Sequence, residues 1–137
     1  MKNKFLVTVL LISAILLSTF AANAQEGRKV IAVINKADWC PVCQTNGEKM
    51  MKEVMPVFNE SNVQFIMNDL TSDATKADSK MGLDKANVYG AVKKISATGW
   101  VLLVDAETGK LLDKISVAEP AEKLVMMIKK SAMTEKM

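Results

Sequence analysis

The chain has 137 residues, of which 18 are basic, 15 are acidic and none is histidine. This length suits one domain with a modest core, and a formal net charge of +3 gives no argument for a nucleic acid or an anionic membrane as partner. The absence of histidine excludes Ser-His and Cys-His hydrolase chemistry and c-type haem attachment, and it removes the most common metal ligand.

The N-terminus has the three parts of a secretory signal peptide. Residues 1–4 are short and basic, residues 5–17 are almost wholly apolar, and residues 22–24 (Ala-Asn-Ala) form a small-residue cleavage site. The apolar run is shorter than the roughly 20 residues of a membrane span, and an uncleaved anchor is the alternative. We predict cleavage after Ala24, one domain over residues 25–137 and, because this short signal looks bacterial, a periplasmic location.

The first half of the remaining chain predicts a strand, a helix and a second strand. Residues 28–34 form a β-branched run of the kind that is buried on both faces of a sheet. Pro41 suits the first turn of a helix that extends to about Met55, and Pro56 suits the end of that helix or a kink. Residues 63–67 predict the second strand, which ends before two polar residues.

The second half predicts two more strands and further helices. In chain order we expect a loop with some helix over 71–83, a short helix over 84–95, a strand over 100–104, a hairpin turn over 105–109, a strand over 110–117 and an amphipathic helix over 121–132. The resulting order is β-α-β-α-β-β-α. It predicts an α/β fold in which a central mixed sheet of four strands carries helices on both faces.

Cys40 and Cys43 stand three residues apart, between the first strand and the first helix. A disulfide between them closes a very small loop and stabilises the fold little, so this spacing favours chemistry, with one sulfur exposed and the other behind it. Cys40 would lie at the helix N-terminus, where free N–H groups and the helix dipole stabilise a thiolate. Cys43 would lie about one turn along the same face. We therefore predict that Cys40 is the attacking thiol and Cys43 the resolving thiol.

Three neighbours of Cys40 bear on this site. Trp39 would form a partly exposed apolar shoulder beside the sulfur, with ordinary packing as an equal alternative. A nearby Asp38 would oppose ionisation of the Cys40 thiol, whereas Lys36 would favour it. The sequence alone does not rank these two charges.

The segment Ala37-Asp38-Trp39-Cys40-Pro41-Val42-Cys43, after a buried strand and before a helix, resembles the active-site segment of thioredoxins. This Trp-Cys-x-x-Cys arrangement is more specific than a bare C-x-x-C motif. The resemblance covers most of residues 28–132, without the N-terminal strand and helix of full thioredoxins. It implies a thioredoxin-like fold and a thiol–disulfide oxidoreductase that exchanges disulfides with protein substrates. We expect a monomer that uses no cofactor and no metal.

Three features of that family are replaced here. Thioredoxins keep a buried acid six residues before the first cysteine, where this chain has Ile34, and Asp69 is only a guess as substitute. Their cis-proline, which shapes the substrate groove, corresponds to Thr98 or Gly99, and we assign these two residues, together with Trp39, to substrate binding. The proline that kinks the middle of the active-site helix is also absent.

The direction of electron flow is open, because Pro41-Val42 differs from the Gly-Pro of reducing cytosolic thioredoxins. A reductase resembling the periplasmic maturation thioredoxins is favoured, and it would need a membrane or soluble redox partner. The alternative is a Cu(I)-binding, metallochaperone-like protein that uses the same two thiolates. Ten methionines invite this idea, although helix positions that fill a core explain most of them. An inert stabilising or binding module is the third alternative.

Overall fold

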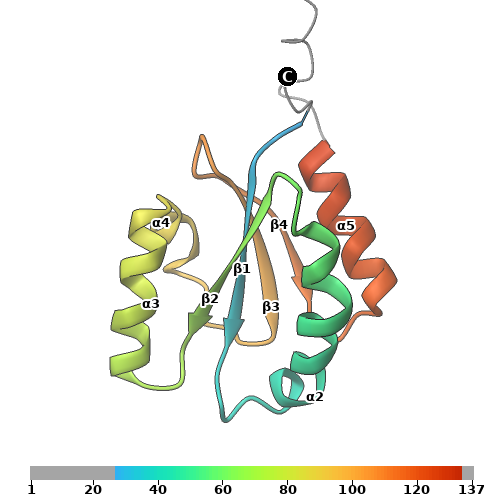
Figure 1. Ribbon diagram of the computed structural model, residues 1–137. Helices are drawn as coiled ribbons and strands as arrows, with labels where there is room; N and C mark the ends of the chain where they lie inside the picture. The colour runs from blue at the N-terminus through green and yellow to red at the C-terminus, as the bar shows by residue number, and fades with distance from the viewer. Residues whose placement is uncertain (1–26, 134–137) are drawn as a thin grey trace, which may run out of the picture.

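The computed structural model describes residues 27–133, so the predicted signal peptide lies outside the described residues (Figure 1). A four-stranded sheet has the order β2-β1-β3-β4. Its strands are β1 (Val30–Lys36), β2 (Val63–Asp69), β3 (Trp100–Asp105) and β4 (Leu111–Ser116). β1 is parallel to β2 and antiparallel to β3, and β3 is antiparallel to β4. The predicted mixed sheet of four strands is therefore confirmed.

Helices cover both faces of this sheet, as Figure 1 shows. α2 (Pro41–Lys49) and α5 (Ala121–Met133) lie on one face, and α3 (Asp73–Lys85) and the short α4 (Tyr89–Val92) lie on the other. Among the described residues, no helix has the length and apolar character that crossing a membrane would require.

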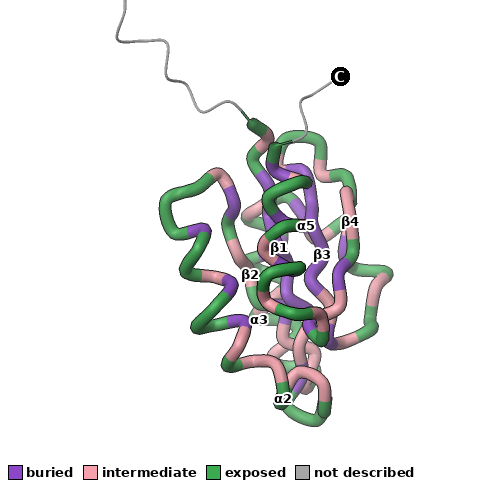
Figure 2. The backbone as a smooth tube through the Cα atoms, turned by 90° about the vertical axis from the view of Figure 1, so that its right-hand side faces the viewer, coloured by how far each residue is buried: buried purple, intermediate pink, exposed green. Residues whose placement is uncertain are grey.

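β1 is buried on both faces because its side chains alternate between two apolar clusters. Ala32 and Ile34 pack in the cluster that includes the inner face of α5, whereas Ile31 and Val33 pack in the cluster beneath α3 and α4. Leu124, at 0% exposure, belongs to the buried stripe of α5. Figure 2 shows this buried core running along β1 and β3. The β-branched run at 28–34 thus predicted the central strand correctly.

α3 differs from the expectation of a loop with some helix over 71–83. The hydroxyl of Ser72 accepts a hydrogen bond from the Thr75 N–H at 3.2 Å, and the Thr75 hydroxyl accepts one from the Ser72 N–H at 3.0 Å. This capping box starts a regular helix. Only Leu83 of α3 is buried, so the helix leaves little hydrophobic periodicity in the sequence.

The helix expected over 84–95 is correspondingly shorter. α3 ends at Lys85, Asn87 adopts a positive φ of 59°, and helical geometry resumes only for the single turn of α4. Asparagine tolerates this left-handed conformation better than most residues, and it breaks the helix here.

The active-site helix keeps α geometry only as far as Lys49. It continues as a π-helical turn over Met50–Val54 and a 3-10 turn over Met55–Phe58, which contains Pro56. Met50 and Val54 are buried in the π turn. The irregularity that a mid-helix proline gives to thioredoxins is replaced here by a change of helix type further along the chain.

Candidate functional site

A disulfide joins Cys40 and Cys43 at the N-terminus of α2, with the two Cα atoms 5.3 Å apart. Cys40 is the N-cap residue, with an extended backbone (φ −87°, ψ 111°). Its Sγ accepts a hydrogen bond from the backbone N–H of Cys43 at 3.3 Å. Pro41 occupies the first turn, where a missing N–H leaves no hydrogen bond unmade. A thiolate at Cys40 would therefore have both an N–H donor and the positive end of the helix dipole.

The two cysteines differ in exposure. Cys40 is buried, with 2% of its surface exposed, whereas Cys43 is partly exposed and lines a cavity. If Cys40 is the attacking thiol, it would be expected to be the more exposed cysteine. The observed exposures of the two residues are the reverse.

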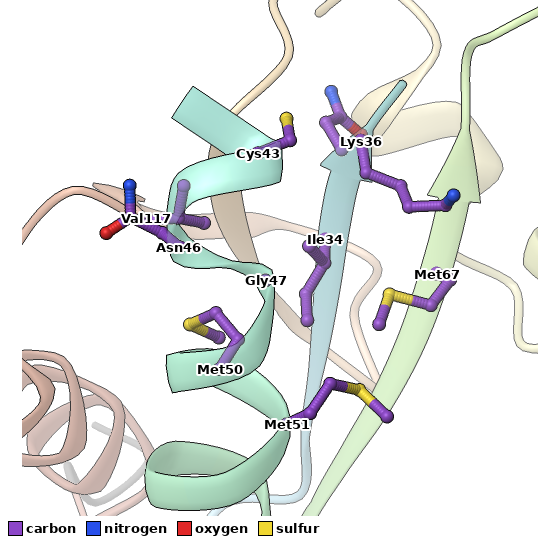
Figure 3. Close-up of a pocket in the computed structure, with 10 residues that line it drawn as sticks. Ile34, Lys36, Cys43, Asn46, Gly47, Met50, Met51, Met67 and Val117 are labelled. Carbon is purple, nitrogen blue, oxygen red and sulfur yellow. The ribbon is translucent and has the colours of Figure 1, made fainter. Parts of the chain in front are cut away.

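The cavity beside Cys43 has a volume of about 260 Å³ and lies between α2 and the strands β1 and β2 (Figure 3). Its lining is mostly apolar and contains no acidic side chain. Met51 and Met67, which are 55% and 37% exposed, line it too, so the cavity is open to solvent. The lining residues are Ile34, Asn35, Lys36, Cys43, Asn46, Gly47, Met50, Met51, Met67 and Val117.

Ile34 stands where thioredoxins would carry the buried acid, and it is 5% exposed in the wall of this cavity. Asp69, the guessed substitute, is not among the lining residues. Its carboxylate accepts hydrogen bonds from the hydroxyl and the N–H of Thr71 and lies 3.1 Å from Nζ of Lys36. The Thr71 hydroxyl, the Thr71 N–H and Lys36 lower the pKa of Asp69, although burial opposes them. Asp69 is therefore held as a carboxylate at the sheet edge and does not replace the acid.

Lys36 and Asp38, which were expected to act on Cys40 in opposite senses, contact each other. Nζ of Lys36 lies 3.4 Å from Oδ1 of Asp38, whose side chain is 76% exposed. The hydrogen bond with Asp69 is the main cause that raises the pKa of Lys36, and Asp38 adds to it. The Lys36 charge is thus shared between two carboxylates at the end of β1.

Trp39 lies on the surface next to the disulfide. The residue is 61% exposed, and its indole N–H donates to the backbone carbonyl of Thr71 at 3.3 Å. Thr71 also accepts, through its hydroxyl, a hydrogen bond from the Asp38 N–H at 2.9 Å. The ring is therefore held in an exposed position beside the dithiol by the loop that follows β2.

Gly99 lies against the dipeptide between the two cysteines. Its φ is +80°, and a Cβ at this position would overlap Cγ1 of Val42. The Gly99 N–H donates to the Asn35 carbonyl at 2.8 Å, and the Gly99 carbonyl accepts from the Val117 N–H at 2.9 Å. Thr98 is partly exposed beside it. No cis peptide bond occurs among the described residues. This loop therefore approaches the dithiol through a glycine backbone with a positive φ, and not through a cis-proline.

A buried pair of amides, which was not predicted from the sequence, supports this loop. Asn35 and Asn68 are partners in the β1–β2 register, and the Asn68 side-chain amide donates to the Asn35 side-chain carbonyl at 2.8 Å. The Asn35 amide donates in turn to the carbonyls of Ile95 and Ala97, at 2.8 and 3.2 Å. Both asparagines directly follow the strands predicted over 28–34 and 63–67, whereas β1 and β2 extend through them to Lys36 and Asp69. An asparagine after each of two predicted parallel strands was the available signal.

The described residues contain no group of three or more histidine, cysteine or acidic side chains that could hold a metal ion. Figure 3 shows Met51 and Met67 toward the other end of the cavity from Cys43. The Cu(I) alternative therefore depends on the two cysteine sulfurs.

Comparisons with known proteins give structural similarity alone. No protein-family model matches the sequence, and no curated protein matches it. A solved structure described as Trxlp from Edwardsiella tarda EIB202 is similar with a TM-score of 0.47 and 17% identity, over 81% of this chain and 92% of that one. A structure described as a malarial protein is similar with a TM-score of 0.46 and 20% identity, over 74% and 96%.

The fold is assigned from the topology of the chain itself. β1 leads directly into a helix that begins with the dithiol, and β2 follows parallel to β1. The hairpin of β3 and β4 completes the sheet, and the final helix α5 packs on one of its faces. These features give the chain a thioredoxin-like α/β fold with a CXXC pair at the start of α2.

Proposed function

We propose that this protein is a thiol–disulfide oxidoreductase of the cell envelope that exchanges disulfides with protein substrates through Cys40 and Cys43. The observation that carries the proposal is the placement of this pair at the start of α2, where the Cys43 N–H donates to the Cys40 sulfur at 3.3 Å. A donor in this position stabilises a thiolate, and thiolates are the species that attack and leave in disulfide exchange.

The exchange transfers two electrons and needs no cofactor. In the reducing direction, one thiolate of the dithiol attacks a substrate disulfide, forms a mixed disulfide and releases one substrate thiolate. The second cysteine thiolate of the pair then attacks the sulfur of the first cysteine in the mixed disulfide. This step re-forms the Cys40–Cys43 bond and releases the second substrate thiolate. We favour this direction, with a membrane or soluble redox partner that re-reduces the pair.

Substrate contacts are assigned to Trp39, Thr98 and Gly99. The exposed ring of Trp39 offers an apolar surface beside the disulfide. Both backbone polar groups of Gly99 are already bonded within the fold, so its contribution is the close approach to Val42. Main-chain pairing with a substrate would fall to Thr98, which precedes it.

Insulin reduction tests the proposed activity. The chain should accelerate precipitation of insulin by dithiothreitol, and Cys40→Ser and Cys43→Ser should each abolish the acceleration, because both sulfurs are needed for a full exchange cycle. Ser131→Ala, on α5 far from the dithiol, should behave like the wild type. A wild-type chain that fails to exchange but holds one equivalent of Cu(I) tightly would establish the metal-binding alternative.

The direction is decided by the reduction potential measured in glutathione buffers. A value near the roughly −270 mV of thioredoxin supports a reductase. A value near the roughly −120 mV of a strong oxidase contradicts it.

A further inference from the structure

The 96–99 loop, which approaches the dithiol through Gly99, is held by one residue of the sheet. Asn35 is fully buried near the end of β1. Its side-chain amide donates to the carbonyls of Ile95 and Ala97, at 2.8 and 3.2 Å. Its backbone carbonyl accepts from the Gly99 N–H at 2.8 Å. Three hydrogen bonds that fasten the loop and the residue before it therefore end on Asn35.

Thr98 is the residue that this arrangement leaves unpaired. It is partly exposed, and it makes no hydrogen bond with another described residue. Ala97 and Gly99, on either side of it, are both bonded to Asn35. Gly99 also lies against Val42, between the two cysteines. The free N–H and carbonyl of Thr98 are therefore held at a fixed place beside the dithiol.

We infer that Asn35 is a positioning residue for protein substrates: its side-chain amide holds the 96–99 loop so that a substrate chain can pair with the backbone of Thr98. The inference rests on the proposed function and deepens it by naming the group that holds the substrate surface in place. Both amide protons of Asn35 are used by the carbonyls of Ile95 and Ala97, so the side chain has no donor left for a cysteine sulfur.

Asn68 determines which way the Asn35 amide points. Asn68 lies on β2, is 7% exposed, and donates its side-chain amide to the Asn35 side-chain carbonyl at 2.8 Å. An Asn35 amide turned over would place its oxygen against the carbonyls of Ile95 and Ala97 and leave buried groups without partners. The bond from Asn68 therefore keeps both donors of Asn35 on the loop.

This role distinguishes protein substrates from small disulfides. A small disulfide needs only access to the sulfurs, whereas a protein chain must also lie along the loop while its disulfide reacts. Main-chain pairing gives affinity to an extended segment, and misplacement of a positioning group by about 1 Å can cost on the order of a hundredfold in rate. Loosening the loop should therefore slow exchange with a protein and spare exchange with a small disulfide.

Comparing two substrates tests the inference. The reduced chain is mixed with insulin or with bis(2-hydroxyethyl) disulfide, which has no peptide backbone, and the reaction is quenched in acid and alkylated. Asn35→Ala should slow the reaction with insulin by about tenfold or more and leave the reaction with the small disulfide within about twofold of the wild type. Equal losses with both substrates would overturn the inference, because they would place the effect at the sulfurs or in the fold as a whole.

Asn62→Ala is the matched control. The Asn62 side-chain amide donates to the Arg28 carbonyl near the start of β1, so this variant also removes a bond from an asparagine amide to a backbone carbonyl. Its ratio of insulin rate to small-disulfide rate should equal that of the wild type. A ratio that falls as far as in Asn35→Ala would show that lost stability explains both variants, and the inference would fail.

A second variant and a measurement on the wild type apply where Asn35→Ala does not fold. Asn68→Ala keeps the Asn35 side chain but removes the bond that orients it, and it should lower the same ratio by about threefold or more. In the wild type, NMR in D2O should show the side-chain amide protons of Asn35 exchanging at least about tenfold more slowly than those of the exposed Gln64. An unchanged ratio in folded Asn68→Ala, or an unprotected Asn35 amide, would overturn the inference.

Failure of the inference is distinguishable from failure of the proposed function. If the wild type reduces neither insulin nor the small disulfide, the proposed function fails and the inference fails with it. If the wild type reduces both, and Asn35→Ala keeps the wild-type ratio, the inference alone fails. A wild-type chain that reduces only the small disulfide contradicts both, because both require protein substrates.

Discussion

Gly99 shows how a single residue reshapes the surroundings of the dithiol. A loop built around a proline presents a ring to the disulfide, whereas this loop presents a backbone with no side chain. The positive φ of +80° and the closeness of Val42 both require that absence. Because Gly99 is bonded to Asn35 on one side and Val117 on the other, its position is fixed by the sheet.

Replacing this glycine should therefore destabilise the fold. In Gly99→Ala the left-handed conformation costs about 1–2 kcal/mol, and the overlap with Val42 adds to that cost. Gly90→Ala is the control, because its Cβ meets nothing within 4 Å and its backbone needs no positive φ. That variant should be stabilised by about 0.4–1 kcal/mol. Urea unfolding measures both, and equal stability of the two variants would contradict this reading of Gly99.

The ends of β1 and β2 act together as one element that holds the loops around the site. In the parallel register Asn35 is the partner of Asn68 and Lys36 is the partner of Asp69. The asparagines bond across the buried end, and the ion pair follows at the edge. Through Thr71, Asp69 also supports the loop that holds Trp39. Two consecutive register pairs thus connect the sheet to loops on either side of the disulfide.

This strand-end element should make stability depend on pH. The pKa of Asp69 is lowered in the folded chain, first by the Thr71 hydroxyl and also by Lys36, so the unfolded chain binds this proton more readily. The contribution of the Asp69 carboxylate to the unfolding free energy is fully present above pH 3.8, the ordinary pKa of aspartate. It is lost as the pH falls through the lowered pKa of Asp69. Asp69→Asn keeps an acceptor for Thr71 and removes the charge.

Urea unfolding between about pH 2 and pH 6 should show a smaller rise in unfolding free energy with pH for Asp69→Asn than for the wild type. Asp78→Asn, on the exposed side of α3, controls for the change in net charge. A wild-type slope retained by Asp69→Asn would show that this carboxylate does not contribute.

The elements that the sequence predicted well are those with a strong local signal. The β-branched run of β1 and the apolar stripe of α5 determine burial directly, and the turn over 105–109 is formed by Asp105, whose side chain accepts from the Glu107 and Thr108 N–H groups. α3 was underestimated because its start depends on two hydroxyls and its body is almost wholly exposed.

The motif itself located the dithiol. The exposures of Cys40 and Cys43, and the amide support of the 96–99 loop, depend on contacts between distant segments and could not be predicted from spacing.

At the scale of the whole molecule, the dithiol and the ends of the described chain lie at opposite ends of the sheet. The described chain runs from Gly27 through β1 toward the start of α2, and α5 runs back to Met133, as Figure 1 shows. The Arg28 N–H donates to the Ala132 carbonyl at 2.8 Å, which ties the first strand to the last helix. A change before residue 28 therefore lies far from the chemistry, whereas a change at Arg28 affects how the sheet and α5 are joined.

Two shortened chains separate these cases. Residues 25–137, the mature chain that the predicted signal cleavage would leave, keep every contact described for Arg28 and should fold and reduce insulin. Residues 30–137 lose the bond to Ala132 and the hydrogen bonds that the Arg28 and Lys29 carbonyls accept from Asn62 and Ala106. They also lose the Arg28 charge, whose Nε lies 3.1 Å from Oδ2 of Asp105 with only 16% and 5% of the two side chains exposed. Losing a partly buried charge partner and three hydrogen bonds of the 28–29 backbone should lower the unfolding free energy by about 2 kcal/mol or more. Circular dichroism during urea unfolding compares the two chains. If residues 25–137 fail to fold, the domain boundary is wrong, and if residues 30–137 are as stable as residues 25–137, Arg28 does not join the sheet to α5.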